Sequence, residues 1–95
     1  MVVTVITADV EDEVLEVTAM VSDVVEQDGT CTLIASKGSR RETATTGTST
    51  APASTYCGLM TIPAADLSAG EWKIVVEYDS TAHAGQSDAE SVVVP

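Results

Sequence analysis

The chain contains no Phe and no Asn, and its aromatic residues are limited to Tyr56, Trp72 and Tyr78. The absence of Asn removes every acceptor for N-glycosylation. Because so few rings are available, the core has to be filled mainly by Val and Ala, which belong to the 44% of residues that are hydrophobic. Val is β-branched and fits a half-buried strand better than a helix. The composition therefore favours an all-β protein.

Cations are also scarce. Lys37, Arg40, Arg41 and Lys73 stand against fifteen carboxylates, and the formal net charge is -11. So few cations cannot displace the counterions of nucleic acid, and the excess negative charge repels an anionic lipid surface. The composition therefore excludes nucleic acid as a direct partner. The carboxylates that precede residue 30 are mostly interleaved with Val and Thr, which is typical of the solvated face of a strand pair.

Long apolar runs are missing. No stretch approaches the roughly 18 apolar residues that a membrane-spanning helix needs, so we expect no direct membrane insertion. No basic segment followed by an apolar run marks a signal peptide at the N-terminus. Met1 stands directly before VVTV, and Pro95 directly follows SVVV. We therefore expect residues 1–95 to be a single domain excised from a larger extracellular protein, with targeting and anchoring elements outside this chain.

Apolar and polar residues alternate through most of the chain, which is the period of a β-strand. The first strand is expected at Val2–Thr7, and a long second strand at Val14–Val25. The Asp-Gly pair in QDGT is a hairpin signal, because both residues tolerate positive φ. It predicts that a third strand, about Cys31–Ser36, pairs with the second strand in antiparallel fashion.

The middle of the chain is predicted to be less regular. SKGSRRE should form a turn, and RRETAT should form a short polar strand whose charges suit a sheet edge. Thr45–Thr55 contains no Val, Ile or Leu, so we expect a loop there. A short strand is expected at YCGLMTI, and Pro63 favours one helical turn after it.

The clearest strand is EWKIVVEYD, where Trp72, Ile74, Val76 and Tyr78 lie on one face. Trp72 should be the largest single contributor to the core, since aromatic rings bury the most area. STAHAGQSD is predicted to be a loop, and Ala89–Val94 the last strand. About seven short strands separated by turn signals predict an all-β, antiparallel β-sandwich.

The segment DLSAGEWKIVVEY resembles the penultimate strand of immunoglobulin-like and fibronectin-III-like domains in bacterial cell-surface proteins. In those domains a Leu, a Gly and an aromatic residue lead into alternating apolar residues. The matching positions here are Leu67, Gly70, Trp72, Ile74, Val76 and Tyr78. The final ESVVVP is similar to their closing strand, so the resemblance implies an immunoglobulin-like β-sandwich. Antibody-type domains bridge their second and sixth strands, whereas Cys31 and Cys57 fall on the predicted third and fifth strands, which favours a bacterial or macroglobulin-like variant.

Cys31 and Cys57 are the only cysteines. A zinc site normally takes four N or S ligands, and the chain offers only His83 besides them. Redox catalysis usually takes Cys-x-x-Cys near a helix N-terminus, and two unpaired core thiols are a further alternative. A disulfide is the main prediction. It closes a loop of about 25 residues, which contributes on the order of 3 kcal/mol, and it places the protein outside the cytoplasm.

Calcium is the one metal for which the sequence offers a candidate set of ligands. Asp9, Glu11 and Asp12 lie close together in the chain, and Asp79 or Asp88 joins them if the loops converge. Calcium needs six or more converging oxygens, and no calcium-loop spacing occurs. A solvated acidic rim explains these residues more simply, so no metal is predicted.

Catalysis is not expected either. A catalytic triad needs a base that a carboxylate orients, and His83 with Asp79 or Asp88 is the only candidate. An exposed His in a loop is the simpler explanation. We therefore expect no enzymatic activity and no cofactor.

The sequence predicts a non-enzymatic immunoglobulin-like structural or interaction module of a bacterial cell-surface or secreted protein. Its partners are expected to be neighbouring domains of the parent protein, which supplies the anchor. The alternative is an adhesin-type module that binds a surface protein or a glycan through the loops Thr43–Thr55 and Ser80–Gly85. Tyr56 is then the candidate for stacking on a sugar, because Trp72 is committed to the core. The Thr-rich loop also has a composition that suits O-glycosylation.

Overall fold

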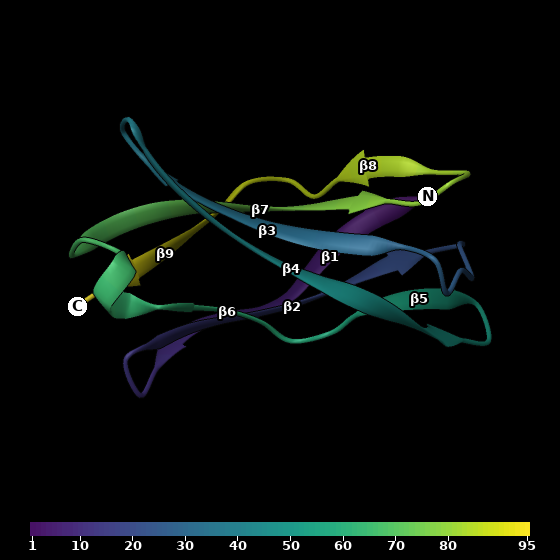
Figure 1. Ribbon diagram of the computed structural model, residues 1–95, viewed down its shortest axis with the longest axis horizontal. Helices are drawn as coiled ribbons and strands as arrows, with labels where there is room; N and C mark the ends of the chain where they lie inside the picture. The colour runs from purple at the N-terminus through teal and green to yellow at the C-terminus, as the bar shows by residue number, and fades with distance from the viewer.

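The computed structural model describes all 95 residues, from Met1 to Pro95. Nine strands and one short 3-10 helix make up the regular structure (Figure 1). The elements are β1 (Val2–Glu11), β2 (Val14–Ser22), β3 (Thr30–Lys37), β4 (Arg40–Ala51), β5 (Ser54–Cys57), β6 (Met60–Pro63), η1 (Ala64–Asp66), β7 (Gly70–Asp79), β8 (Ala84–Gln86) and β9 (Glu90–Val94). Every strand pair is antiparallel, so the predicted all-β antiparallel class is confirmed, with nine strands instead of seven.

The strands follow one continuous path in the order β1-β2-β5-β4-β3-β7-β8, with β6 beside β2 and β9 beside β7. Strand β4 connects the two halves of this path, because its residues 40–47 pair with β3 and its residues 48–51 pair with β5. The sheet therefore curls around the core as a half-barrel (Figure 1). We call β1, β2, β5 and β6 the first ladder, and β3, β7, β8 and β9 the second ladder.

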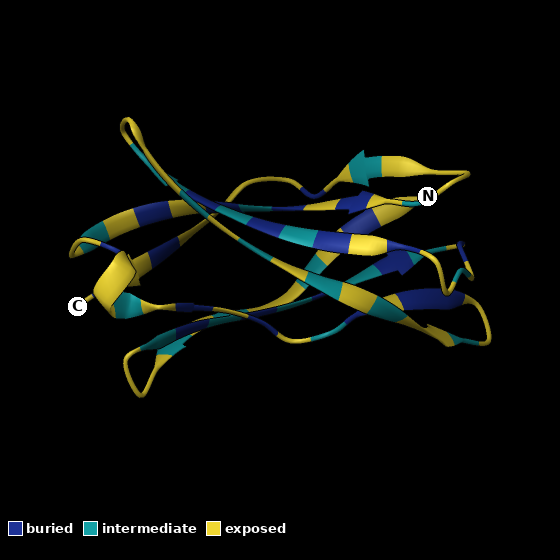
Figure 2. Cartoon of the chain, in the orientation of Figure 1, coloured by how far each residue is buried: buried dark blue, intermediate teal, exposed yellow.

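A cluster of 19 buried residues fills the space between the ladders. The alternation in the sequence places them there. In β7, Trp72, Ile74, Val76 and Tyr78 are at most 1% exposed, while the residues between them are exposed or half-buried. Figure 2 shows the same alternation as dark blue bands along the strands. Trp72 is fully buried, as predicted, and its indole N–H donates to the carbonyl of Ser68 at 2.7 Å, which satisfies the polar edge of the ring.

Two predicted turns are confirmed. In SKGSRRE, Lys37 pairs with Arg40, and Gly38 and Ser39 form a two-residue hairpin turn. Gly38 has a φ of 59°, a left-handed conformation that favours glycine. The helical turn after Pro63 is the 3-10 helix η1. No helix of the structure has the length and apolar character needed to cross a membrane.

The predicted hairpin between the second and third strands is wrong. Strand β2 pairs with β1, β5 and β6, whereas β3 pairs with β4 and β7. Residues 23–29, which we call the crossover, pass from one ladder to the other. The positive φ in this segment lies at Asp23 (62°) and not at Gly29. Glycine is needed at position 29 for a different reason, because a Cβ atom there would overlap the ring of Tyr78.

The predicted loop Thr45–Thr55 is also wrong. Strand β4 continues to Ala51, and the chain turns at Pro52 and Ala53 to return as β5. Thr is β-branched and suits a strand, and the residues of β4 are exposed or half-buried, so they need no Val, Ile or Leu. The predicted edge position of RRETAT agrees with the register, because residues 40–47 of β4 pair with β3 alone and only residues 48–51 pair with β5.

The C-terminal third agrees better with the sequence. Strand β7 covers EWKIVVEYD, and β9 falls within the predicted last strand. The predicted loop STAHAGQSD contains the short strand β8, which pairs with the end of β7. The molecule measures 38 × 25 × 16 Å, and its N- and C-termini lie at opposite ends of the longest axis (Figure 1).

Candidate functional site

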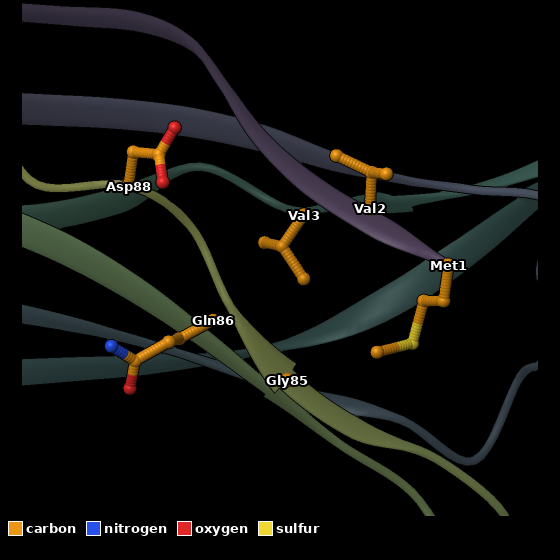
Figure 3. A pocket seen from close by; sticks show the side chains of 6 residues that line it. All are labelled: Met1, Val2, Val3, Gly85, Gln86 and Asp88. Atoms are coloured by element: carbon orange, nitrogen blue, oxygen red, sulfur yellow. The ribbon is translucent and has the colours of Figure 1, made fainter.

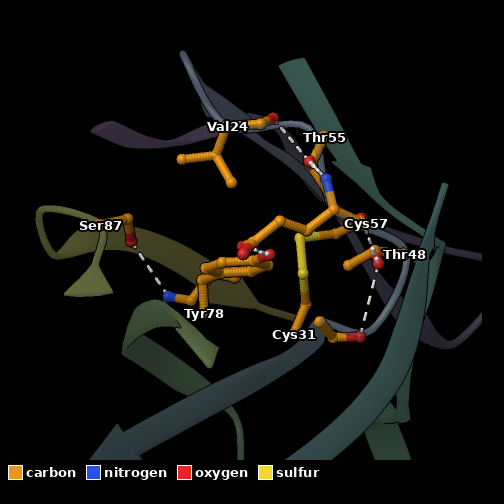
Figure 4. Close-up of a disulfide and its surroundings, with 10 residues drawn as sticks. Val24, Cys31, Thr48, Thr55, Cys57, Tyr78 and Ser87 are labelled. Carbon is orange, nitrogen blue, oxygen red and sulfur yellow. Dashed lines mark hydrogen bonds between the residues drawn. A yellow bond between two sulfur atoms is a disulfide. The ribbon is translucent and has the colours of Figure 1, made fainter. Parts of the chain in front are cut away.

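Cys31 and Cys57 form a disulfide inside the core (Figure 4). Cys31 comes from the inner face of β3 and Cys57 from the end of β5, so the bond joins the second ladder to the first. The Cα atoms are 5.8 Å apart, and neither thiol is free. Both sulfur atoms are therefore occupied and serve neither as zinc ligands nor as nucleophiles. A small β domain closed by a disulfide fits a non-cytoplasmic protein.

Near the disulfide, the carboxylate of Glu26 collects three polar partners. The hydroxyl groups of Tyr78 and Ser80 donate to Oε1 at 2.6 and 2.9 Å, and Nδ1 of His83 lies 3.1 Å from Oε2. The Glu26 side chain is only 14% exposed, whereas that of His83 is 45% exposed. Glu26 belongs to the crossover, and its partners belong to the end of β7 and the turn before β8. The four side chains therefore hold these two segments together.

The protonation states of this cluster suit that role. The hydrogen bond from Tyr78 is the largest effect on the pKa of Glu26 and lowers it below its ordinary value. Desolvation opposes this lowering, and the hydrogen bonds with Ser80 and His83 lower the pKa further. Burial raises the pKa of Tyr78 to about 12, and the hydrogen bond to Glu26 contributes in the same direction. At neutral pH the phenol is therefore protonated and donates to an ionised carboxylate.

A second carboxylate of the crossover, Asp28, holds the same turn. The hydroxyl of Thr81 donates to Oδ2 at 2.7 Å, and the backbone N–H of Thr81 donates to the same oxygen at 3.4 Å. These hydrogen bonds lower the pKa of Asp28, with the hydroxyl as the main cause. The turn between β7 and β8 is therefore fixed at two adjacent positions.

His83 lies exposed in the turn between β7 and β8, as expected, and neither carboxylate considered as its partner in a triad is the one it contacts. The imidazole pairs with Glu26 instead of Asp79 or Asp88. Ser80 directs its hydroxyl to Glu26 and to the carbonyl of His83, and it accepts two backbone N–H groups of its own turn. A serine nucleophile needs its hydroxyl on the imidazole. This arrangement therefore holds a turn in place and does not activate a nucleophile.

The buried hydroxyl of Thr55 is a second feature that the sequence did not reveal (Figure 4). It donates to the carbonyl of Val24 at 2.6 Å and accepts the backbone N–H of Glu26 at 3.0 Å. The hydroxyl of Thr48 donates to the carbonyl of Glu26 at 3.2 Å. These bonds satisfy backbone groups of the crossover, which has no strand partner of its own. No buried side-chain N or O atom in the structure lacks a partner.

Both features bring together residues that are distant in the sequence. Glu26 and His83 are 57 positions apart, and Thr55 and Val24 are 31 positions apart. No local pattern encodes such pairs. The only signal was the position of Glu26 just before the Asp-Gly pair, in a segment too polar to continue the alternation of β2.

The carboxylates considered for calcium do not converge. Asp9, Glu11 and Asp12 lie at the hairpin between β1 and β2, whereas Asp79 ends β7 at the opposite end of the molecule (Figure 1). Asp88 lies between β8 and β9, beside the start of β1. No three carboxylate, imidazole or thiol groups are close enough together to hold a metal ion.

Tyr56 lies on the outer face of β5 and is 38% exposed. It is in register with Met20 of β2 and with Ser49 of β4, so its ring is available on the surface of the first ladder. The predicted binding loops differ from the expectation. Thr43–Thr55 is mostly a β-hairpin, and Ser80–Gly85 is a turn held by the crossover that runs into β8.

No known family model matches the chain, and neither the curated proteins nor the solved structures contain a match. Its function therefore has to be inferred from the fold, the disulfide and the surface.

Proposed function

We propose that this chain is a non-enzymatic, immunoglobulin-like module of a bacterial cell-surface or secreted protein, with a structural or interaction role. The observation that carries the proposal is the buried disulfide between the two ladders. Disulfides persist in oxidising compartments and are most useful to small domains with a limited core. Closing this loop contributes on the order of 3 kcal/mol, a large part of the roughly 5–15 kcal/mol that stabilises a domain.

The strand order supports the immunoglobulin-like part of the proposal. Immunoglobulin constant domains have one sheet in the order ABED and a second in the order CFG. Strands β1, β2, β5 and the second half of β4 correspond to A, B, E and D, while β3, β7 and the β8–β9 pair correspond to C, F and G. The disulfide then joins C to E and not B to F, which agrees with a variant distinct from antibody domains.

The positions of the termini support a spacer role. They lie at opposite ends of the longest axis, so neighbouring domains of a parent chain are carried end to end (Figure 1). The polar cluster around Glu26 supports the non-enzymatic assignment, because its hydrogen bonds connect the crossover to the turn after β7.

The experiment that tests this proposal is the intact mass of the protein after export through an oxidising route. The protein is alkylated under denaturing conditions with and without prior reduction, and we expect label only after reduction. A Cys57→Ser variant is the matched control and should take one label without reductant. Two labels on the wild-type chain without reductant would mean that both thiols are free, and the extracellular assignment would fail.

Binding of a carbohydrate or protein ligand is a second candidate function, which the exposed ring of Tyr56 favours. A glycan array with the wild-type chain, Tyr56→Phe and Tyr56→Ala separates the two candidates. Binding that survives in Tyr56→Phe and is lost in Tyr56→Ala would replace the spacer role by glycan recognition. The spacer role predicts no reproducible binding by any of the three proteins.

A further inference from the structure

The four Lys and Arg side chains of this acidic chain all lie at one end of β3 and of the two strands beside it. Lys37 pairs with Arg40 in the β3–β4 hairpin, which projects at the same end of the molecule as the C-terminus (Figure 1). Next to them Arg41 pairs with Ser36 of β3, and Lys73 of β7 lies on the other side of the same Ser36. This end is therefore where the surface of a chain of net charge -11 attracts an anionic group.

Two of these cations already have partners. The side chains of Lys37 and Arg40 donate to backbone carbonyl groups of the loop before β7, so they hold this loop in place. Arg41 and Lys73 are exposed, and neither forms an ion pair with any of the fifteen carboxylates. Their charges are therefore free to receive a ligand.

The two free cations belong to a row of hydrogen-bond donors that crosses four strands. This cationic row consists of Ser91 of β9, Lys73 of β7, Ser36 of β3 and Arg41 of β4, each in register with the next. Residues in register on neighbouring strands point to the same face. This is the outer face, because the residues on either side of Lys73 are buried in the core. Neighbouring strands are about 4.8 Å apart, so Ser36 lies midway between two cations whose Cα atoms are separated by about 10 Å.

Carboxylates near the row limit the size of the anion that it accepts. On the same face of β7, Glu71 is about 7 Å from Lys73 along the strand and Glu77 is about 13 Å from it. Glu42 and Glu90 are in register with buried residues and so belong to the opposite face. A long polyanion would extend over Glu71 and Glu77 and be repelled. A single carboxylate above the centre of the row avoids both.

Aliphatic side chains lie beside the row. Ile34 of β3 and Val75 of β7 are in register with each other, two positions along the strands from the row, and both are half-buried on the same outer face. None of the three aromatic residues lies on this face, because two are buried in the core and Tyr56 belongs to the first ladder. The face therefore offers aliphatic contact and no ring on which a sugar could stack.

The small groove between β1 and β8 offers no second site for the same ligand (Figure 3). Its walls are formed by Met1, Val2, Val3, Gly85, Gln86 and Asp88. Asp88 is its only charged side chain, and the side chain of Met1 occupies the space beside Gly85. A carboxylate that entered this groove would be repelled.

We propose that the cationic row binds an acidic segment of a partner protein, in which an Asp or Glu side chain is followed two positions later by an aliphatic one. The carboxylate lies between Arg41 and Lys73, above the hydroxyl of Ser36. Arg binds a carboxylate through two parallel N–H···O bonds. Alternate side chains of an extended segment are about 7 Å apart, which is also the step from the row to Ile34 and Val75. This inference rests on the interaction role proposed above and names the kind of partner.

The test is a two-dimensional ¹H–¹⁵N NMR titration of the intact chain at physiological ionic strength. The probe is a capped heptapeptide in which Glu and Ile stand two positions apart among Gly and Ser. We expect dose-dependent shifts of the amide signals of residues 34–36, 41–43 and 73–75, and no such shifts with a peptide that carries Gln for Glu. Absence of these shifts, or equal shifts with the Gln peptide, would overturn the proposal. Methyl glucuronide is the second probe, and binding as strong as that of the Glu peptide would replace the peptide by an acidic sugar.

Substitutions then identify the surface. Arg41→Gln and Lys73→Gln should each weaken peptide binding about fivefold, the upper end for an exposed ion pair. Arg40→Gln is the matched control, because it changes the net charge equally but its side chain turns to the loop before β7. Equal weakening by Arg40→Gln would refute binding at the row. The spectra of the variants without peptide show whether each is folded. A failure here leaves the alkylation test of the proposed function unaffected, since the row lies on the outer face and contains no cysteine.

Discussion

Replacing Thr55 with Val tests how the crossover is held against the core. The two side chains have nearly the same volume, so the change replaces a hydroxyl by a methyl group. The carbonyl of Val24 and the N–H of Glu26 both lose the hydroxyl as their hydrogen-bond partner. A buried polar group left without a partner costs about 1–3 kcal/mol. Because the Glu26 contact is only part-buried and water replaces some of it, we expect a total loss of about 2 kcal/mol in the free energy of unfolding.

The control is Thr55→Ser, which keeps the hydroxyl and removes one methyl group. Its expected cost is about 1 kcal/mol, the value for a single buried methyl group. The predicted order of stability is therefore wild type, then Thr55→Ser, then Thr55→Val. Hydrophobic burial alone predicts that the Val variant is at least as stable as the wild type.

Equilibrium unfolding in urea, with the disulfide intact, measures these differences. Trp72 is the only Trp and is fully buried, so its fluorescence reports loss of the core directly. A Thr55→Val protein that matches or exceeds the wild-type stability would refute the role assigned to the hydroxyl.

Three further predictions follow from the same region and from the glycine positions. The folded state lowers the pKa of Glu26, so the ionised Glu26 carboxylate stabilises the fold above the ordinary pKa of 4.5, and this stabilisation is lost as the pH falls through the lowered pKa. Glu26→Gln should therefore flatten the acid side of a plot of urea midpoint against pH, and an unchanged slope would contradict this. The raised pKa of Tyr78 predicts stability that is complete below pH 10 and is lost as the pH rises towards about 12, and Tyr78→Phe should remove that alkaline loss. Gly29→Ala should destabilise the fold by about 2 kcal/mol, because its Cβ overlaps the Tyr78 ring. Gly47→Ala, where nothing lies within 4 Å, should be neutral or slightly stabilising, and equal thermal midpoints for the two variants would contradict the packing argument.

The sequence predicted best the elements whose signal is local. In β7 every second residue is apolar, so strand, inner face and the burial of Trp72 all follow from one pattern. The turn at Gly38 was equally visible, because Gly between two strand-like segments marks a positive φ. With only two cysteines in the chain there is a single pairing, and the structure forms it.

The errors come from residues whose role depends on distant partners. The Thr residues of β4 looked like a loop because they bring little apolar surface, yet the segment is regular because it pairs first with β3 and then with β5. The glycine at position 29 looked like a hairpin residue, but it makes room for a ring that comes from β7. The cluster around Glu26 was hidden for the same reason, since its partners are more than 50 positions away.

The arrangement of the two ends also determines how this chain responds to mechanical load. The N- and C-termini leave from opposite ends of the longest axis, and the terminal strands β1 and β9 are antiparallel to β2 and β7 (Figure 1). Ladder hydrogen bonds run perpendicular to their strands. A force applied between the two ends therefore loads all the hydrogen bonds of the β1–β2 pair, and all those of the β7–β9 pair, in shear at the same time and does not break them one after another. Even after both terminal strands have detached, the segment from Cys31 to Cys57 stays closed by its covalent bond and cannot lengthen.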